Sequence, residues 1–130
     1  MKKELLDYID KVGLIGAGHP HSLAHLKTLR WIDQIVDIPV YDSDESKTQY
    51  AKEEIGNKIG ETYTNLDSLL GRSDVPVVFV CLPNDVAADA TKGGLLKNAH
   101  VFCEKPPGKN LREIISVQEI EKKSNNLKLK

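Results

Sequence analysis

This sequence of 130 residues has few cysteines and few aromatic residues, and its acidic and basic residues are nearly equal in number. It holds two cysteines, 5% aromatic residues, and 18 basic against 19 acidic residues. Two cysteines are too few for a disulfide scaffold, and balanced charge argues against a surface that binds nucleic acid. No apolar run approaches the roughly 18 residues of a membrane span, and no apolar stretch follows the basic N-terminus as in a signal peptide. We therefore expect one cytoplasmic domain over residues 1–130, with free thiols and neither nucleic-acid nor membrane partners.

What the sequence does contain is an alternation of short apolar runs with segments of helical periodicity. Runs of this kind, continuous and only a few residues long, are typical of strands buried on both faces. Strands are predicted at 12–15, 35–41, 75–82 and 99–103, with a weaker one near 62–63. Helices are predicted at 21–31, 44–55, 66–70, 86–97 and 111–123. The alternation predicts an α/β fold, a doubly wound and mainly parallel sheet with helices on both faces.

Local residues refine some of these elements. Pro20 suits the first turn of the first helix, and Pro39 predicts a bulge or a shifted strand boundary, because proline cannot donate to a sheet. Asn65 or Thr64 would cap the helix at 66–70. The pair Gly93-Gly94 weakens the helix at 86–97, since each glycine costs ~1 kcal/mol relative to alanine.

The first predicted strand runs directly into the glycines of Gly16-Ala17-Gly18. Glycines between a buried strand and a helix permit a tight turn and the close approach of a pyrophosphate, which the amides and positive dipole of the helix N-terminus attract. A plain glycine turn is the alternative. Two residues depart from the G-x-G-x-x-G pattern: Pro20 lacks an amide, and His21 replaces the third glycine, so the helix is expected to lie further from the strand.

Polar residues end the other strands at the same predicted edge, where ligands of such sheets bind. Asp42, followed by Ser43, ends the second strand; a carboxylate there accepts from the ribose hydroxyls and repels a 2′-phosphate, which favours NAD over NADP. Asp44 suits a helix-capping role better than Asp42. Asn84, after Leu82 and Pro83, could contact the second ribose, although Asn84 or Asp85 could equally cap the next helix.

The fifth strand runs into Glu104-Lys105-Pro106. Pro106 biases Lys105 toward an extended backbone, from which its ammonium could polarise a substrate oxygen or donate a proton. A charged pair in an ordinary surface turn is the alternative. Cys81 and Cys103 are predicted to end neighbouring strands as small buried thiols. His21 and His25 are four residues apart on one helix without a metal-binding context, so we predict no metal site.

Together these segments resemble the Gfo/Idh/MocA family of NAD(P)-dependent oxidoreductases. The matching segments are VGLIGAG at 12–18, AHL at 24–26, VYDSD at 40–44, VVFVCLPN at 77–84 and HVFCEKP at 100–106. The resemblance implies that Lys105 lies beside the nicotinamide and assists catalysis, and that Glu104 helps to position it. Ala87 departs from the family, which often has histidine there.

The resemblance also implies a second, C-terminal domain that binds a sugar, cyclitol or related substrate. We expect that domain to be absent here, because the sequence stops at 127–130, in what resembles a sixth strand; an excised domain and a natural truncation are both compatible with this. We therefore expect cofactor binding without turnover, and a possible homodimer through the exposed strand edge. The alternative is a non-enzymatic regulatory module that binds NAD(H) or CoA. The residues predicted to bind the cofactor are Ile15, Gly16, Gly18, His19, Pro20, Asp42, Ser43, Leu82, Pro83, Asn84, Glu104 and Lys105, of which Lys105 is the catalytic candidate.

Overall fold

The sheet of this protein contains five strands that all run in the same direction. In the computed structural model, which describes residues 9–124, the spatial order is β3-β2-β1-β4-β5. The strands are β1 (Val12–Ile15), β2 (Ile38–Tyr41), β3 (Ile59–Tyr63), β4 (Val77–Val80) and β5 (His100–Cys103). The order reverses between β1 and β4, which places the switch point of a doubly wound sheet beside β1.

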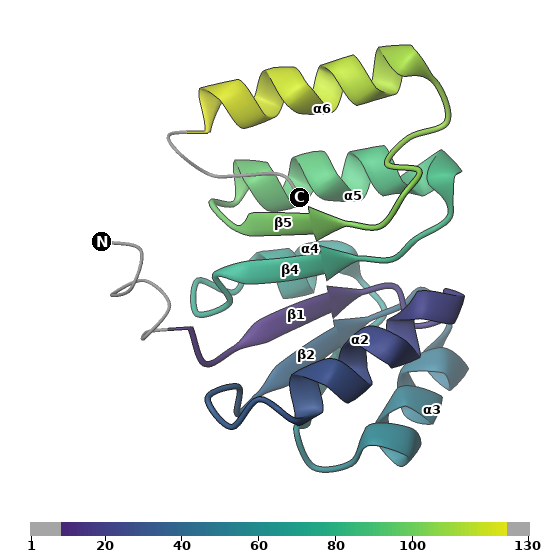
Figure 1. The fold of residues 1–130 in the computed structure, drawn as a ribbon, viewed down its shortest axis with the longest axis vertical. Coiled ribbons are helices and arrows are strands. Elements are labelled where there is room, and N and C mark those ends of the chain that lie inside the picture. The colour runs from purple at the N-terminus through teal and green to yellow at the C-terminus, as the bar shows by residue number, and fades with distance from the viewer. Residues whose placement is uncertain (1–8, 125–130) are drawn as a thin grey trace.

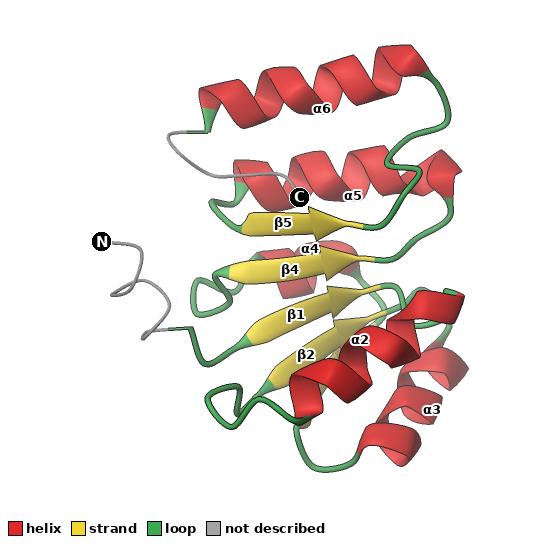
Figure 2. Cartoon of the chain, viewed as in Figure 1, coloured by secondary structure: helices red, strands yellow, loops and turns green. Residues whose placement is uncertain are grey.

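Helices cover both faces of this sheet (Figures 1 and 2). They are α2 (Pro20–Arg30), α3 (Glu45–Ile55), α4 (Leu66–Leu70), α5 (Asn84–Leu96) and α6 (Leu111–Lys123). Helices α2 and α3 lie on one face, α4 and α5 lie on the other, and α6 packs against α5 (Figure 1). The predicted fold class, a doubly wound parallel sheet of the Rossmann type, is confirmed.

Two apolar cores separate along the two faces because successive strand residues point in opposite directions. Leu14 and Ile15 are neighbours in β1 and are both fully buried. Leu14 packs with Leu26 of α2, whereas Ile15 belongs to the cluster on the opposite face that includes Leu95 of α5. A strand that is apolar at every position is therefore buried on both faces, as the short apolar runs predicted.

The glycine pair in α5 brings the helix close to the sheet and to α4. A Cβ built on Gly94 would lie 2.9 Å from Val101 Cγ2, and one built on Gly93 would lie 3.0 Å from Leu70 Cδ1. The helix spans both glycines without interruption. The two glycines lower the intrinsic helix propensity of α5, but they allow close packing that a larger residue would prevent, and this packing offsets the loss.

The boundaries of several elements differ from the sequence prediction. β2 begins at Ile38 rather than 35, and the predicted irregularity at Pro39 is confirmed by a register shift between Ile38 and Val40. β4 covers 77–80 rather than 75–82. Pro83 stands at the N-cap of α5 without a side-chain bond, so capping by Asn84 or Asp85 was wrong. The prediction for 127–130 lies outside the described residues.

A candidate dinucleotide site at the switch point

The turn after β1 has a conformation that only glycine adopts readily. Gly16 has φ +101°, and its N–H donates to the Tyr41 carbonyl at 2.8 Å. A Cβ on Gly16 would overlap the backbone carbonyl of Cys81. The turn therefore passes directly over the end of β4, at the switch point, and leaves no space for a side chain.

Helix α2 begins immediately after this turn with Pro20 at its first position. His19 is the N-cap residue, and its Nδ1 accepts the His21 N–H at 2.9 Å. Ser22 is fully buried, and its Oγ donates to the Gly16 carbonyl at 2.7 Å. The small residue that packs against the turn is thus Ser22, one position later than the third glycine of the usual pattern. His21 is exposed, so the expectation that its bulk keeps the helix away from the strand was wrong.

Asp42 connects the glycine turn to the end of β2. Asp42 is 7% exposed, and its two carboxylate oxygens accept the N–H groups of Ala17 at 2.8 Å and Asp44 at 2.9 Å. Asp44 caps α3 by accepting the Ser46 N–H, as predicted. Each carboxylate oxygen of Asp42 keeps a lone pair for a further donor. The site therefore presents a fixed, nearly buried anion beside the phosphate turn.

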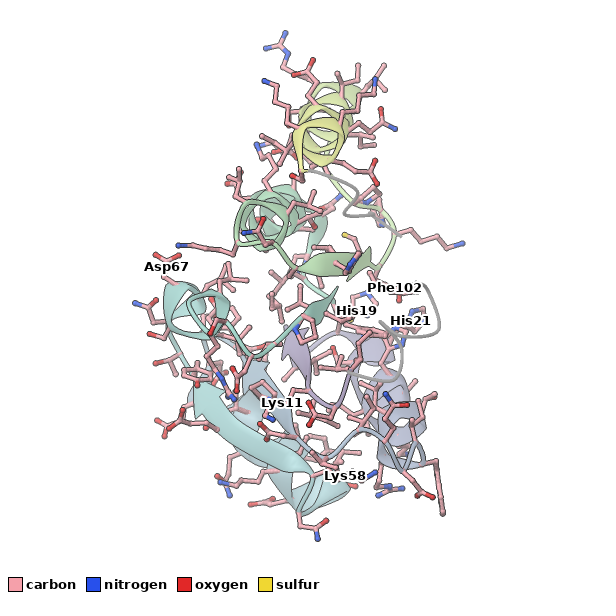
Figure 3. The ribbon with its side chains drawn as sticks, turned by 90° about the vertical axis from the view of Figure 1, so that its left-hand side faces the viewer. Lys11, His19, His21, Lys58, Asp67 and Phe102 are labelled. Carbon is pink, nitrogen blue, oxygen red and sulfur yellow. The ribbon has the colours of Figure 1, made fainter. Side chains whose placement is uncertain are left out.

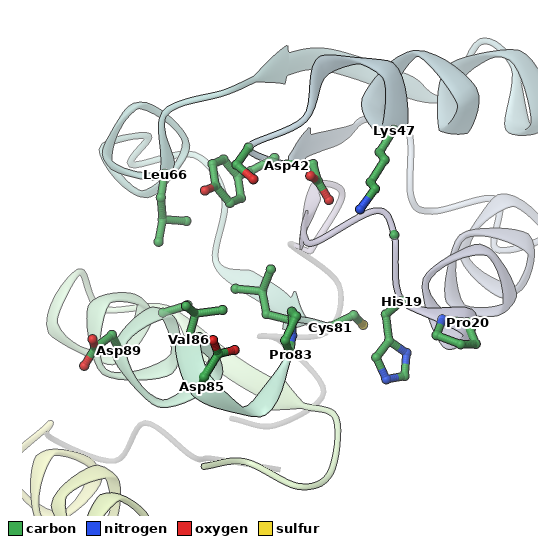
Figure 4. A pocket seen from close by; sticks show the side chains of 15 residues that line it. His19, Pro20, Asp42, Lys47, Leu66, Cys81, Pro83, Asp85, Val86 and Asp89 are labelled. Atoms are coloured by element: carbon green, nitrogen blue, oxygen red, sulfur yellow. The ribbon is translucent and has the colours of Figure 1, made fainter. Parts of the chain in front are cut away.

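These elements border one cleft of about 660 Å³ (Figure 4). Seven of the predicted cofactor residues line it, namely Gly18, His19, Pro20, Asp42, Ser43, Leu82 and Pro83. Sequence reasoning missed other lining residues, which are Tyr41, Lys47, Leu66, Cys81, Asp85, Val86, Asp89 and Ala90. Most of these follow strand ends or begin the next helix, which is the one signal that could have identified them. A glycine turn, a buried acid and apolar walls fit the phosphates, ribose and base of a dinucleotide.

The other five predicted residues lie outside the lining of this cleft. Ile15 is fully buried beneath the turn, and Gly16 forms the turn itself. Asn84 is exposed at the start of α5. Glu104 and Lys105 follow β5, where the Glu104 N–H donates to the Val80 carbonyl at 2.9 Å and Lys105 is exposed.

Glu104 is directed toward α2 and contacts two histidines that the sequence analysis left without a role. His25 Nε2 lies 2.9 Å from Glu104 Oε2, and His21 Nδ1 lies 3.1 Å from Oε1. Hydrogen bonds from His25 and then His21 hold the pKa of the Glu104 carboxyl below its usual range. The His25 ring contacts Phe79 and Phe102, which stack on each other at 4.9 Å. Figure 3 shows Phe102 and His21 on the same side of the sheet.

Cys81 lies beside this cluster, and its thiol is the third possible metal ligand there. The ligand atoms of His25, Cys81 and Glu104 lie within 4.8 Å of one another. Burial, followed by the charge of Glu104, raises the pKa of Cys81 to about 12. Both Glu104 oxygens already contact histidines, so the described residues form a hydrogen-bonded cluster at this position. Cys81 and Cys103 are both free thiols at the ends of neighbouring strands, as predicted, but only Cys81 is buried; Cys103 is half-buried, so the prediction of burial was wrong for it.

No helix within residues 9–124 is long and apolar enough to cross a membrane.

Comparison with known proteins assigns this chain to a family. Residues 11–129 match the model of an oxidoreductase family with an NAD-binding Rossmann fold, the Gfo/Idh/MocA family. Myo-inositol 2-dehydrogenase from Thermotoga maritima is 27% identical over 115 residues, which cover 88% of this chain and 34% of that protein. 1,5-Anhydro-D-fructose reductase from Ensifer adhaerens is 34% identical over 105 residues, 81% of this chain and 31% of that protein. The chain thus spans about a third of the length of these relatives.

A solved structure agrees with this assignment at the level of the fold. Scyllo-inositol dehydrogenase from Lactobacillus casei, crystallised with NAD(H) and scyllo-inositol, superposes with a TM-score of 0.81 at 23% identity, over 92% of this chain and 35% of that one. From the family match over nearly all of its length, we conclude that this chain belongs to the Gfo/Idh/MocA oxidoreductases and forms their NAD-binding Rossmann domain.

Proposed function

We propose that this chain binds NAD(H) in the cleft at the switch point and is the cofactor half of an enzyme that transfers hydride. The observation that carries the proposal is the bond between the turn and the acid: the Ala17 N–H donates to Asp42 Oδ2 at 2.8 Å. This bond holds a turn shaped for a pyrophosphate next to a carboxylate suited to ribose hydroxyls.

Each end of the proposed cofactor meets different residues. The Gly16-Ala17-Gly18 turn and the start of α2 would hold the phosphates, and Asp42 with Ser43 would hold the adenosine ribose. Leu82, Pro83 and Asn84 would lie along the second ribose. The nicotinamide supplies the site that accepts or donates hydride. Lys105 would contact the substrate oxygen there and move a proton to or from it, with Glu104 fixing the backbone of that turn.

The charge of Asp42 favours NAD over NADP, because a 2′-phosphate would meet a carboxylate that is nearly buried. Titration of the protein with NADH and NADPH, followed by the fluorescence of the reduced nicotinamide, tests this preference. Wild-type protein should saturate with NADH at lower concentration than with NADPH. Asp42→Asn should lower the ratio of the dissociation constants for NADPH and NADH about tenfold, since the amide lacks the charge that repels the 2′-phosphate. Failure of both nucleotides to bind at millimolar concentration would refute the proposal, and equal weakening of both by Asp42→Asn would limit Asp42 to a structural role.

We further propose a sugar, cyclitol or similar alcohol or carbonyl compound as the substrate of the complete enzyme, because the relatives named above act on such compounds. Residues 9–124 form the Rossmann domain, and the second domain that would enclose the substrate is not among them. Purified protein should therefore bind NADH without oxidising it in the presence of inositols or anhydrofructose. Steady oxidation of NADH by the pure chain would contradict this expectation.

The remaining proposals concern location and assembly. Two free thiols favour the reducing cytoplasm. Within the described residues, β5 is an edge strand, and an unpaired edge invites pairing with a second copy. Light scattering at high protein concentration should then give the mass of a dimer, whereas the mass of a monomer would count against pairing.

A further inference from the structure

The phosphate turn of this chain has few backbone donors left for a ligand. The N–H groups of Gly16, Ala17, His21 and Ser22 are already bonded within the protein. Pro20 has no N–H. Within residues 16–22, only the amides of Gly18 and His19 lack a partner among the described residues. A dinucleotide that relied on backbone amides alone would find two.

Two side chains stand on either side of Gly18 where those donors are missing. A Cβ on Gly18 would lie 2.8 Å from Lys47 Nζ, so the lysine extends across the turn from α3. Figure 4 shows the Lys47 ammonium between the turn and Asp42, and the His19 ring on the other side of the turn. Both side chains line the cleft. No carboxylate oxygen among the described residues lies within 4.0 Å of Lys47 Nζ, although the charge of Lys47 contributes to lowering the pKa of the nearby Asp44.

The capping bond of His19 determines what its ring offers to a ligand. Because Nδ1 accepts the His21 N–H at 2.9 Å, Nδ1 carries no proton, and a neutral ring must carry its proton on Nε2. His19 therefore presents an N–H donor one ring width beyond its own backbone. This donor compensates for the amide that Pro20 lacks.

From these contacts we propose that His19 and Lys47 form a side-chain phosphate clamp across Gly18, which binds the pyrophosphate of the cofactor. The proposal rests on the proposed function, because it assigns donors within the same cleft. It goes beyond that function because it transfers part of the phosphate recognition from the backbone to two side chains. A charged donor and an oriented N–H on opposite sides of the turn would hold two different phosphate oxygens.

Two substitutions separate the clamp from the fold. His19→Asn keeps the cap, since Oδ1 of asparagine stands where Nδ1 of histidine stands, but it removes the Nε2 donor. Lys47→Gln removes the ammonium and keeps a polar side chain of similar reach. Lys52→Gln is the matched control, because Lys52 is an exposed lysine of the same helix outside the cleft.

Titrations with NADH and NADPH, combined with thermal unfolding, test the clamp. His19→Asn and Lys47→Gln should each weaken NADH binding about 5- to 10-fold, while Lys52→Gln stays within about 2-fold of wild type. The unfolding temperature of His19→Asn should match wild type, whereas His19→Ala should unfold earlier because it lacks the cap. NADH binding as tight in both variants as in wild type would overturn the clamp.

Other outcomes are equally decisive. If Lys47→Gln weakened NADPH alone, Lys47 would bind the 2′-phosphate and the assignment to the pyrophosphate would be wrong. If His19→Asn lowered affinity only together with stability, His19 would act as a cap and not as a ligand. If the wild-type chain did not bind NADH, the proposed function itself would be refuted. If the wild-type chain bound NADH and the two variants bound it equally well, only the clamp would be refuted.

Discussion

Replacing Gly16 by alanine tests the central geometric claim about the phosphate turn. Gly16 and Gly56 share a positive φ, +101° and +96°, but their surroundings differ. A Cβ on Gly56 meets nothing within 4 Å, whereas a Cβ on Gly16 overlaps the Cys81 carbonyl. Gly56→Ala therefore measures backbone strain alone, and Gly16→Ala measures the same kind of strain together with the overlap.

The expected magnitudes follow from these two contributions. An L-residue held at such a φ costs about 1–3 kcal/mol, and displacing packed backbone adds about 1–3 kcal/mol. Gly56→Ala should lower the free energy of unfolding by about 2 kcal/mol, and Gly16→Ala by about 4 kcal/mol. At about 4 °C per kcal/mol for a chain of this size, the unfolding temperatures should fall by about 8 °C for Gly56→Ala and about 16 °C for Gly16→Ala.

Urea unfolding followed by circular dichroism measures these differences. Gly18→Ala provides a third comparison, because the three atoms nearest to its Cβ all belong to the movable side chain of Lys47 and its φ is not positive, so it should cost less than about 1 kcal/mol. The predicted order of stability is wild type, Gly18→Ala, Gly56→Ala, Gly16→Ala. If Gly16→Ala proved as stable as Gly56→Ala, the turn would not lie against the end of β4 as described.

Three further predictions concern titration, reactivity and packing. The histidine contacts lower the pKa of Glu104, so its carboxylate stabilises the fold above its unfolded pKa, and that contribution is lost as pH falls through the lower native pKa. The stability difference between wild type and Glu104→Gln in urea should therefore shrink between about pH 7 and about pH 3, and a constant difference would contradict the assignment. Because the pKa of Cys81 is raised to about 12, mass spectrometry should find it alkylated by iodoacetamide at neutral pH in unfolded protein and scarcely at all in native protein. Replacing Val117, which is fully buried in α6, by alanine should lower the free energy of unfolding by about 2 kcal/mol. Replacing Ile115, which is 44% exposed, should lower it by less than about 0.5 kcal/mol, and equal losses would mean that α6 packs differently.

Local patterns were sufficient for the sheet and the phosphate turn. The run at 12–15, the glycines after it and the acid at Asp42 are each recognisable within a few residues of sequence, because the physical requirement at each position is local. The role of Ser22 was not recognisable. Which residue of a helix faces a turn depends on the angle at which the helix leaves it, and the one-residue shift from His21 to Ser22 follows from that angle.

Contacts between distant segments explain the rest of what the sequence left undetermined. Glu104 lies 79 positions from His25, and nothing in the spacing of either motif relates them. The sequence resemblance linked Glu104 only to its neighbour Lys105. In the structure the carboxylate of Glu104 is bonded to the helix that begins at the phosphate turn, and that helix is bonded to Gly16 through Ser22. The turn proposed to hold the phosphates and the turn that carries Lys105 are therefore both bonded to α2, so a change at either His21 or His25 should disturb both ends of the proposed cofactor site.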